Sequence, residues 1–159
     1  MPEWLFSVLL VAGVVGSAVV GGLYFGFSTS VMGALDRQPP GHAVAAMKAI
    51  NEIILNPVFF VAFFGPAVIS AVLLIGSFFR LADPATPFVI AGALLYLAGS
   101  FGVTMAINVP LNDRLAALSS AEEMEKGWRD YSRPWTWWNS FRTWMSAFAA
   151  LAFILALIA

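Results

Sequence analysis

The residue with the greatest capacity for polar chemistry is Arg142, which lies inside a long apolar stretch near the C-terminus. Asn139 precedes it by three positions, so the two side chains share one face of a helix. A guanidinium and an amide on one face can stabilise an oxygen anion or hold a polar ligand. For Arg142 the alternative is a structural role, in which the side chain extends to the membrane interface.

A second polar series runs through the third apolar stretch at a spacing of four residues. Because polar groups in lipid need partners, we expect this series to face the interior of a helix bundle. We favour a structural role for the hydroxyl groups, which can bond to carbonyls of the preceding turn, and a functional role for the two asparagines, which cost more to bury. The series comprises Tyr96, Ser100, Thr104, Asn108 and, beyond Pro110, Asn112.

Tryptophans are concentrated at the start of the last apolar stretch, where five of the six lie between positions 128 and 144. Trp137 and Trp144 are assigned to an aromatic belt at the level of the lipid headgroups. Trp135 and Trp138 are expected to join Asn139 and Arg142 in one helical patch, because the spacings are three, one and three.

Four stretches without charged residues must position these side chains. They cover residues 4–35, 53–79, 84–112 and 143–159 and hold 32, 27, 29 and 17 residues. About 20 apolar residues cross the hydrocarbon core of a bilayer, and the last stretch reaches that length if it begins at Trp137. The chain is therefore predicted to be an all-α integral membrane protein. We expect one domain, 1–159, that forms an up-down-up-down four-helix transmembrane bundle with spans at about 5–32, 53–79, 88–109 and 137–158.

Helix start signals predict the shorter elements. Ser119 or Ser120, followed three residues later by Glu122 or Glu123, is a capping box, which predicts a short interfacial helix between spans three and four. Asn56, followed by Pro57, is typical of a capped helix start. Gly65 and Pro66 predict a kink within the second span. Residues 42–50 form a short amphipathic segment before that span.

The first span carries two stripes of small residues that allow close helix contact. Packing within one chain is the favoured role, and homo-oligomerisation through one stripe is the alternative. One stripe comprises Gly13, Ser17 and Gly21, and the other Gly22, Gly26 and Ser30.

The distribution of lysine and arginine predicts the orientation in the cell membrane. The connections after spans one and three, with their flanks, carry seven of these residues, whereas the opposite side carries only Arg80. Since positive charges are retained in the cytoplasm, both termini are expected outside.

Composition excludes several classes of function. A net charge of −1 without a basic tract argues against nucleic-acid binding, and the lack of cysteine excludes thiolate chemistry. The one histidine, His42, excludes a multi-histidine metal site within the chain. No metal or other cofactor is expected, and a haem held by His42 is the less favoured alternative. The expected partners are the lipid bilayer and a lipophilic small molecule.

An antiparallel bundle would bring the polar side chains near the span ends to one membrane face. This convergence predicts a single polar mouth in an otherwise apolar bundle. Its members are Ser28, Ser30, Asn51, Asn108, Asn112, Asn139 and Arg142.

Several of these residues belong to segments that resemble a known family. Residues 108–115, Asn-Val-Pro-Leu-Asn-Asp-Arg-Leu, and residues 138–143, Trp-Asn-Ser-Phe-Arg-Thr, resemble hallmark segments of the anthrone-oxygenase-like family of small four-span membrane proteins. The segments 26–35 and 46–51 support the resemblance. It implies oxidation of an anthrone to an anthraquinone by molecular oxygen. The chain departs from the family pattern in having Ser140 and Lys48 where members often have histidine and glutamine.

The resemblance and the polar mouth together predict a membrane oxidoreductase that oxidises a planar lipophilic phenolic or anthrone-like substrate with O2. An electron-rich anthrone anion can react with oxygen without a cofactor, given donors for the oxyanion and a base. Asp113, Glu52 and His42 are the bases near the mouth. A non-enzymatic module, either an assembly partner or a carrier of a lipophilic ligand, is the alternative. The expected catalytic residues are Asn112, Asn139, Arg142 and Asp113, and the expected substrate-binding residues are Asn51, Asn108, Trp135, Trp138 and Ser28.

Overall fold

The computed structural model describes residues 2–159, and within that range the chain is helical and has no strand. The predicted all-α class is therefore confirmed. Several helices follow one another without a break, so the chain forms four long rods together with the separate helix α3. In chain order the rods are Glu3–Leu35, Pro57–Ser77, Thr86–Ala116 and Ala121–Ile158. The elements are α1 (Glu3–Gly26), η1 (Phe27–Val31), α2 (Met32–Leu35), α3 (Pro40–Ile53), α4 (Pro57–Ser77), α5 (Thr86–Leu94), η2 (Leu95–Gly102), η3 (Thr104–Asn108), α6 (Val109–Ala116) and α7 (Ala121–Ile158).

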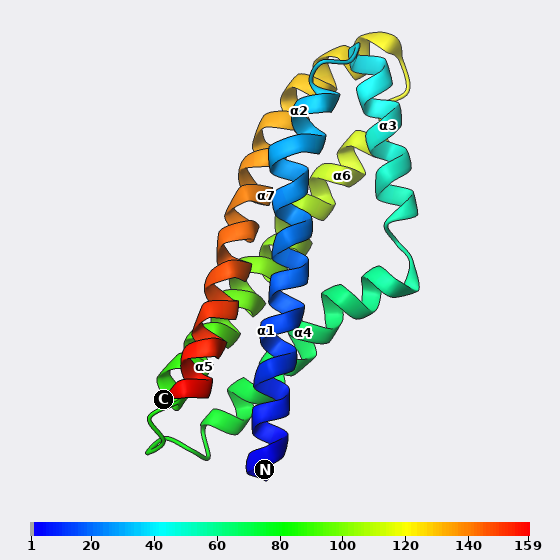
Figure 1. The fold of residues 1–159 in the computed structure, drawn as a ribbon. Coiled ribbons are helices and arrows are strands. Elements are labelled where there is room, and N and C mark those ends of the chain that lie inside the picture. The colour runs from blue at the N-terminus through cyan, green and yellow to red at the C-terminus, as the bar shows by residue number, and fades with distance from the viewer. Residues whose placement is uncertain (1) are drawn as a thin grey trace.

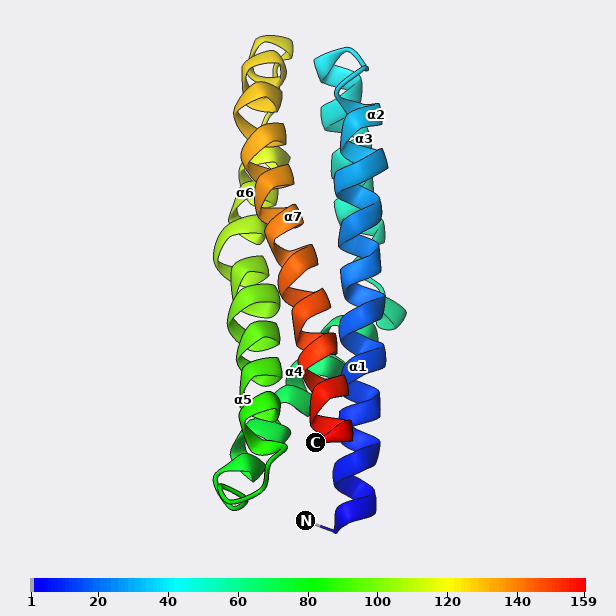
Figure 2. The ribbon, with the colours of Figure 1, turned by 60° about the vertical axis from the view of Figure 1, so that its left-hand side comes forward.

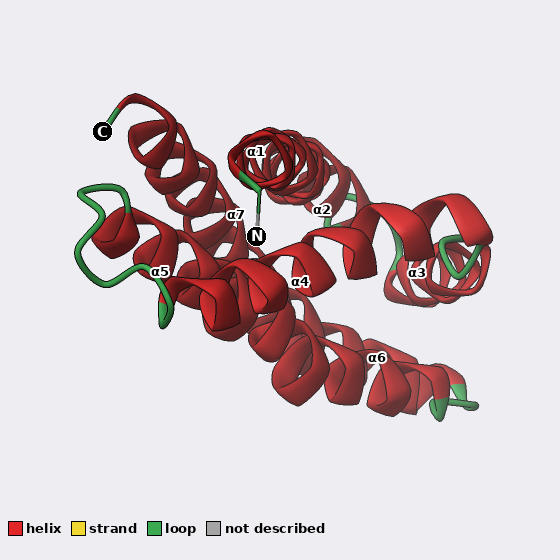
Figure 3. Ribbon diagram, turned by 90° about the horizontal axis from the view of Figure 1, so that it is seen from below, coloured by secondary structure: helices red, strands yellow, loops and turns green. Residues whose placement is uncertain are grey.

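The rods lie side by side in an elongated bundle (Figure 1). The chain runs from the N-terminus along α1 to α2, returns through α3 and α4, and then passes through α5 and α6 before α7 brings it back. Both termini lie at the same end of the molecule (Figure 2). Seen from below, α4 crosses the bundle obliquely (Figure 3).

The outer surface of the bundle is apolar. Val15 is 56% exposed on the first rod, Val61 75% on α4 and Leu151 50% on α7. Within residues 2–159, four helices are long and apolar enough to cross a membrane: Glu3–Leu35, Pro57–Ser77, Thr86–Ala116 and Ala121–Ile158. Large exposed apolar side chains on helices of this length indicate an integral membrane protein.

The second span begins later than expected. The sequence predicted it from Ile53, but that residue ends α3, and α4 begins at Pro57. Asn56 is the predicted cap, since its side chain accepts a hydrogen bond from the backbone N–H of Phe59 at 3.0 Å. The charge-free stretch that predicted the span could not show this break between α3 and α4, because Ile54 and Leu55 are as apolar as the span itself. Pro66 lies within the uninterrupted helix α4.

The short interfacial helix expected between spans three and four is not a separate element. The capping box of Ser120 and Glu123 is confirmed, but it begins α7, which continues without interruption to Ile158. Trp128, Tyr131 and Trp135 lie on one face of α7, and all three side chains are buried in one cluster against α2 and α3. Continuous burial along one face favours one continuous helix, and Pro134 is exposed on the outer side, where water can bond the freed carbonyl.

Small residues set the contacts of the first rod. A Cβ at Gly13 would lie 3.1 Å from the Phe153 ring, and one at Gly21 would lie 3.1 Å from Cβ of Ser146. These two members of the first stripe therefore pack within the chain against α7, as favoured from the sequence. Gly22 and Gly26, in the second stripe, meet nothing within 4 Å.

Local π-helical winding keeps the polar series of the third rod on one face. In an α-helix, residues four apart drift by about 40° per repeat, so a long series would rotate out of the interior. Residues 95–102 and 104–108 are π-helical, and hydrogen bonds to the fifth residue wind the chain more slowly. The predicted inward orientation is confirmed, because the side chains from Tyr96 to Asn108 in the series are all buried.

An ionic cluster ties the first rod to the turn between α4 and α5. Nη2 of Arg80 lies 2.8 Å from Glu3 Oε2 and 2.8 Å from Asp83 Oδ2, and its guanidinium stacks 4.1 Å from the ring centroid of Phe6. Hydrogen bonds to Glu3 and then to Asp83 raise the pKa of Arg80. A hydrogen bond from the backbone N–H of Ala85 and, to a lesser extent, one from the Arg80 side chain lower the pKa of Asp83.

Candidate functional site

Arg142 lies in the interior of the bundle rather than at its surface, with 4% of the residue exposed. Nη1 donates to Oγ1 of Thr104 at 2.8 Å, and Nη2 donates to Oδ1 of Asn139 at 2.7 Å. Thr104 in turn donates to the carbonyl of Ser100 at 2.8 Å, so the hydroxyl of Tyr24, 3.2 Å away, is the donor to Thr104. Residues of three rods therefore hold the guanidinium in one position.

Asn139 connects Arg142 to the first rod. Its amide nitrogen donates to the carbonyl of Tyr24 at 2.6 Å and to Oγ of Ser28 at 2.7 Å, so both amide hydrogens and the oxygen have partners. Oγ of Ser140 lies 2.9 Å from Oγ of Ser28. The predicted pairing of Asn139 with Arg142 and Ser28 is thus present in the structure.

Aromatic rings lie against the guanidinium. Its central carbon is 4.1 Å from the centroid of the Tyr24 ring and 5.7 Å from that of Trp135. Trp135 also contacts Phe27, with 5.8 Å between centroids. An arginine against aromatic faces is stabilised by the ring quadrupoles, an effect that grows where water is excluded.

The positive charge of Arg142 has no acidic partner. Within residues 2–159 the ion pairs involve only Arg80 and Arg129. Two buried polar atoms near the level of Arg142 also have no hydrogen-bond partner: its own Nε and Oδ1 of Asn108. An uncompensated buried cation is costly, and such sites are usually functional. The arrangement is suited to an anionic or strongly polarised oxygen of a ligand.

A second polar layer lies closer to the end of the bundle where α2 and α3 meet. Oδ1 of Asn112 accepts hydrogen bonds from the hydroxyl of Tyr131 and from Nε1 of Trp135, both at 2.8 Å. Asn51 lies near the hydroxyl of Tyr131. Asn108 donates to the backbone carbonyl of Trp135 at 3.4 Å. Three residues expected at the mouth, Asn51, Asn108 and Asn112, therefore lie in one region with Trp135, which was expected to bind substrate.

The structure places other expected residues elsewhere. Trp138 stacks edge-on with Trp137, with 4.6 Å between centroids, and contacts Phe141 rather than Trp135. The helical patch predicted from spacing is therefore split, because Trp138 follows Trp135 by nearly a full turn but points about 60° away from it. The proposed bases Asp113, Glu52 and His42 are exposed. Ser30 is also exposed.

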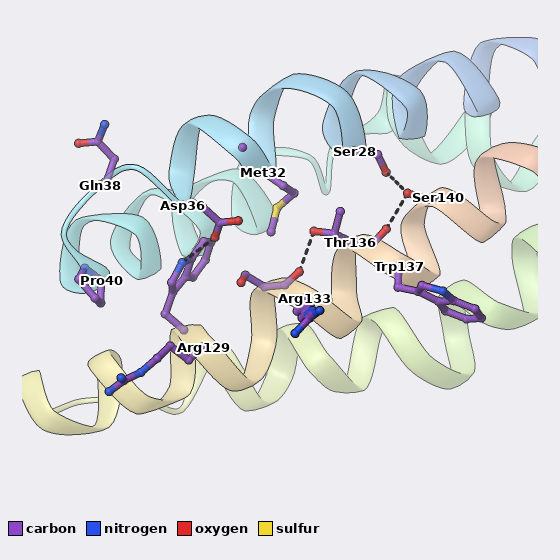
Figure 4. Close-up of a pocket in the computed structure, with 13 residues that line it drawn as sticks. Ser28, Met32, Asp36, Gln38, Pro40, Arg129, Arg133, Thr136, Trp137 and Ser140 are labelled. Atoms are coloured by element: carbon purple, nitrogen blue, oxygen red, sulfur yellow. Dashed lines mark hydrogen bonds between the residues drawn. The ribbon is translucent and has the colours of Figure 1, made fainter.

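An open groove of about 930 Å³ lies between the end of the first rod and the first half of α7. Ser28 and Ser140 lie at one end of the groove and Gln38 and Pro40 at the other (Figure 4). The hydroxyl pair of Ser28 and Ser140 thus connects the groove, through Asn139, to Arg142.

Tyr24 was not predicted from the sequence, and Thr104 was expected to have only a structural role. Tyr24 precedes Ser28 by four residues and therefore shares its helix face, which is the signal that could have identified it. Thr104 does bond the preceding turn as expected, but its oxygen also accepts from Arg142. A hydroxyl can do both, because it has one hydrogen and two lone pairs.

No three acidic or histidine side chains within residues 2–159 come together as a group that could hold a metal ion. The site instead offers hydrogen-bond donors, aromatic faces and one fixed positive charge. Chemically, this arrangement can bind a planar ligand and stabilise negative charge on its oxygen.

The fold and the site define a helical membrane protein that encloses a polar cluster around a buried arginine. The chain belongs to the anthrone oxygenase family, since the model of that family matches residues 59–152. The matched segment includes Thr104, Asn139 and Arg142, whereas Tyr24 and Ser28 lie before it. No curated protein and no solved structure matches the chain.

Proposed function

We propose that the protein is a membrane-embedded, cofactor-independent oxygenase that oxidises a planar lipophilic phenolic or anthrone-like substrate with O2. The observation that carries the proposal is the buried guanidinium of Arg142, held by Thr104 and Asn139 without an acidic partner. Membership of the anthrone oxygenase family supports the class of reaction.

The chemistry needs stabilisation of an anion more than it needs a metal. The methylene carbon of an anthrone loses a proton, and the electron pair is delocalised onto the carbonyl oxygen. The carbanion gives two electrons to O2 as a C–O bond forms, and the peroxide takes up a proton. Loss of water, with the second hydrogen of the methylene, leaves the new carbonyl. One oxygen atom of O2 enters the quinone and the other leaves as water.

Arg142 is assigned the stabilisation of the oxyanion. A fixed cation in a site without water lowers the energy of a developing negative charge without reorganisation. Its partners Thr104 and Asn139 are positioning residues, because they hold Nη1 and Nη2. Trp135 and Tyr24 are assigned contacts with the planar rings, and Asn108 and Asn112 polar contacts with the oxygen substituents of the substrate.

The proton acceptor need not be a strong base. Stabilisation of the anion by Arg142 makes the carbon acid easier to deprotonate, so a weak acceptor suffices. The side chain of Asp113 lies on the surface of α6, so Asp113 accepts the proton only from a substrate that extends to that surface.

The test is O2 consumption together with the absorbance of the quinone product, measured for purified protein in detergent with an anthrone substrate. Subtraction of a blank without protein removes spontaneous oxidation. Arg142→Ala and Asn139→Ala are expected to lose turnover while circular dichroism remains that of a folded helical protein. Thr29→Ala is the control, because the exposed Thr29 hydroxyl bonds only to the carbonyl of Phe25. Unchanged turnover in both site variants would remove the proposed site.

A carrier of an anionic lipophilic ligand is the second candidate. The uncompensated charge of Arg142 favours binding of an anion whether or not a reaction follows. Ser140 also stands where the family resemblance implies a histidine. Absorbance and mass spectra of the purified protein distinguish the two: a carrier retains a bound quinone or phenol and consumes no O2.

A further inference from the structure

The groove between the first rod and α7 lies where the surface of the bundle changes from charged to apolar. On α7 the exposed residues Arg129 and Arg133 are followed by Trp137 and Trp144, each of which is 60% exposed. On the first rod, Phe25 is 59% exposed, whereas the exposed Asp36 lies beyond it. Tryptophans at such a change mark the level of the lipid headgroups. The groove therefore straddles the boundary between water and hydrocarbon.

Hydroxyl groups line the middle of the groove and the end nearer the hydrocarbon. Ser140 donates its hydrogen to the carbonyl of Thr136, so Ser28 accepts from Asn139 and donates to Ser140. Thr136 donates to the carbonyl of Ser132, whereas the Ser132 hydroxyl has no hydrogen-bond partner within residues 2–159. The Ser132 hydroxyl can therefore donate to an ester or phosphate oxygen of a lipid.

Two opposite charges stand further toward water. Arg133 is exposed and has no hydrogen bond or ion pair to residues 2–159, and in Figure 4 it lies between Ser140 and Asp36 along the groove. Asp36 accepts from Nε1 of Trp128 with Oδ1 at 3.0 Å, and Oδ2 has no protein partner within the same range. The order along the groove is thus a cation beside the Ser132 hydroxyl, followed by an anion.

This order is complementary to a zwitterionic lipid headgroup. We propose that the groove binds a membrane aminophospholipid, with its phosphate at Arg133 and the Ser132 hydroxyl and its primary ammonium at Asp36. The acyl chains then lie along the exposed apolar surface that begins at Trp137. The remaining charge in the groove, Arg129, is paired with Glu125 at 3.0 Å and is not needed by the headgroup.

The carboxylate of Asp36 is the feature that selects among lipids. It attracts the ammonium of a phosphatidylethanolamine and repels the additional negative charge of an anionic headgroup. A phosphatidylcholine has the same net charge but no N–H donor, so it forms a weaker contact with the carboxylate. The site does not depend on turnover at Arg142, so its test stands independently of the proposed function.

Native mass spectrometry of the full chain, released from nanodiscs that contain equal amounts of phosphatidylethanolamine, phosphatidylcholine and phosphatidylglycerol with identical acyl chains, tests the proposal. We expect retained phosphatidylethanolamine in preference to either competitor by about tenfold, the factor that corresponds to one good polar contact. Arg133→Gln should weaken retention of phosphatidylethanolamine by about the same factor.

Asp36→Asn gives the sharper outcome. Asparagine keeps an oxygen that accepts from Trp128, so the local structure is retained, but the preference should shift from phosphatidylethanolamine toward phosphatidylglycerol. Arg114→Gln and Glu122→Gln are matched controls, because they remove the same charges at exposed positions outside the groove. Equal retention of the three lipids by the unaltered protein, or an unchanged preference in both groove variants, would overturn the proposal.

Discussion

The guanidinium carbon of Arg142 lies 4.1 Å from the centroid of the Tyr24 ring, so the last membrane helix places its one deeply buried charge directly on an aromatic face of the first. Thr104 of the third rod bonds to both residues. The cluster therefore fixes three rods relative to one another. It also leaves Nε of Arg142 without a partner, which a purely structural cluster would not require.

Replacement of Arg142 by methionine should separate stability from function. Removing a buried charge that has no acidic partner relieves the cost of its desolvation, but it leaves Oδ1 of Asn139 without a donor at a cost of about 1–3 kcal/mol, so the free energy of unfolding is expected to change little. Turnover should fall by about 10²–10³-fold, since the oxyanion loses its fixed cation. Thermal unfolding followed by tryptophan fluorescence, and quinone formation, give the two readings. A variant that unfolds at a lower temperature and retains turnover would contradict both assignments.

Thr104→Val tests the acceptor that positions Arg142. Valine has nearly the same shape, but it leaves Nη1 of Arg142 and the hydroxyl of Tyr24 without their partner. We expect a loss of about 1–3 kcal/mol in stability, together with reduced turnover. Thr143→Val is the matched control, because the Thr143 hydroxyl bonds only to the carbonyl of Asn139 in its own helix. Equal losses of turnover in both variants would show that Thr104 has no special role.

The sequence was sufficient for the elements whose signals are local. Charge-free stretches indicated four membrane helices, and Asn56 and Ser120 identified two helix starts through their capping chemistry. The break between α3 and α4 was missed because Ile54 and Leu55 are as apolar as the span that follows. Likewise, the capping box showed where α7 begins but not that burial of Trp128, Tyr131 and Trp135 would make it continuous.

The site was predictable in most of its polar members but, among its aromatic ones, only in Trp135. Asn139, Arg142 and Ser28 are polar residues in apolar helices, which is why the sequence indicated them. In the structure they are connected by hydrogen bonds. Tyr24 was missed, because its role comes from a contact between the first and last rods, and only its spacing of four from Ser28 pointed to it. Trp138 shows the converse, since its nearness in sequence to Asn139 did not place it beside Arg142.

The turn between α4 and α5 should be an acid-sensitive part of the fold. The folded-state pKa of Asp83 is below its usual value of 3.8, so its contribution to stability is present above that pH and is lost as the pH falls through the lower folded-state pKa. Asp83→Asn should therefore lower the unfolding temperature at pH 7, and the difference from the unaltered protein should shrink as the pH is lowered from about 4. Thermal unfolding between pH 7 and pH 3 measures this difference. Asp130→Asn, at an exposed position outside this cluster, is the control, and a gap for Asp83→Asn that does not change with pH would contradict the prediction.

Close contact between α1 and α4 depends on a glycine facing a proline. A Cβ at Gly16 would overlap Cγ of Pro66, and a proline ring cannot move aside as a flexible side chain can. Gly16→Ala is therefore expected to push the two helices apart and to cost about 1–3 kcal/mol of stability. Gly22→Ala is the matched control on the same helix: it has open space, and alanine is the better helix former by about 0.8–1 kcal/mol, so stability should stay the same or rise. Unfolding temperatures in one detergent give the comparison. A loss in Gly22→Ala, accompanied by a change from a larger to a smaller species on size-exclusion chromatography, would instead indicate that the outward stripe contacts a second copy of the chain.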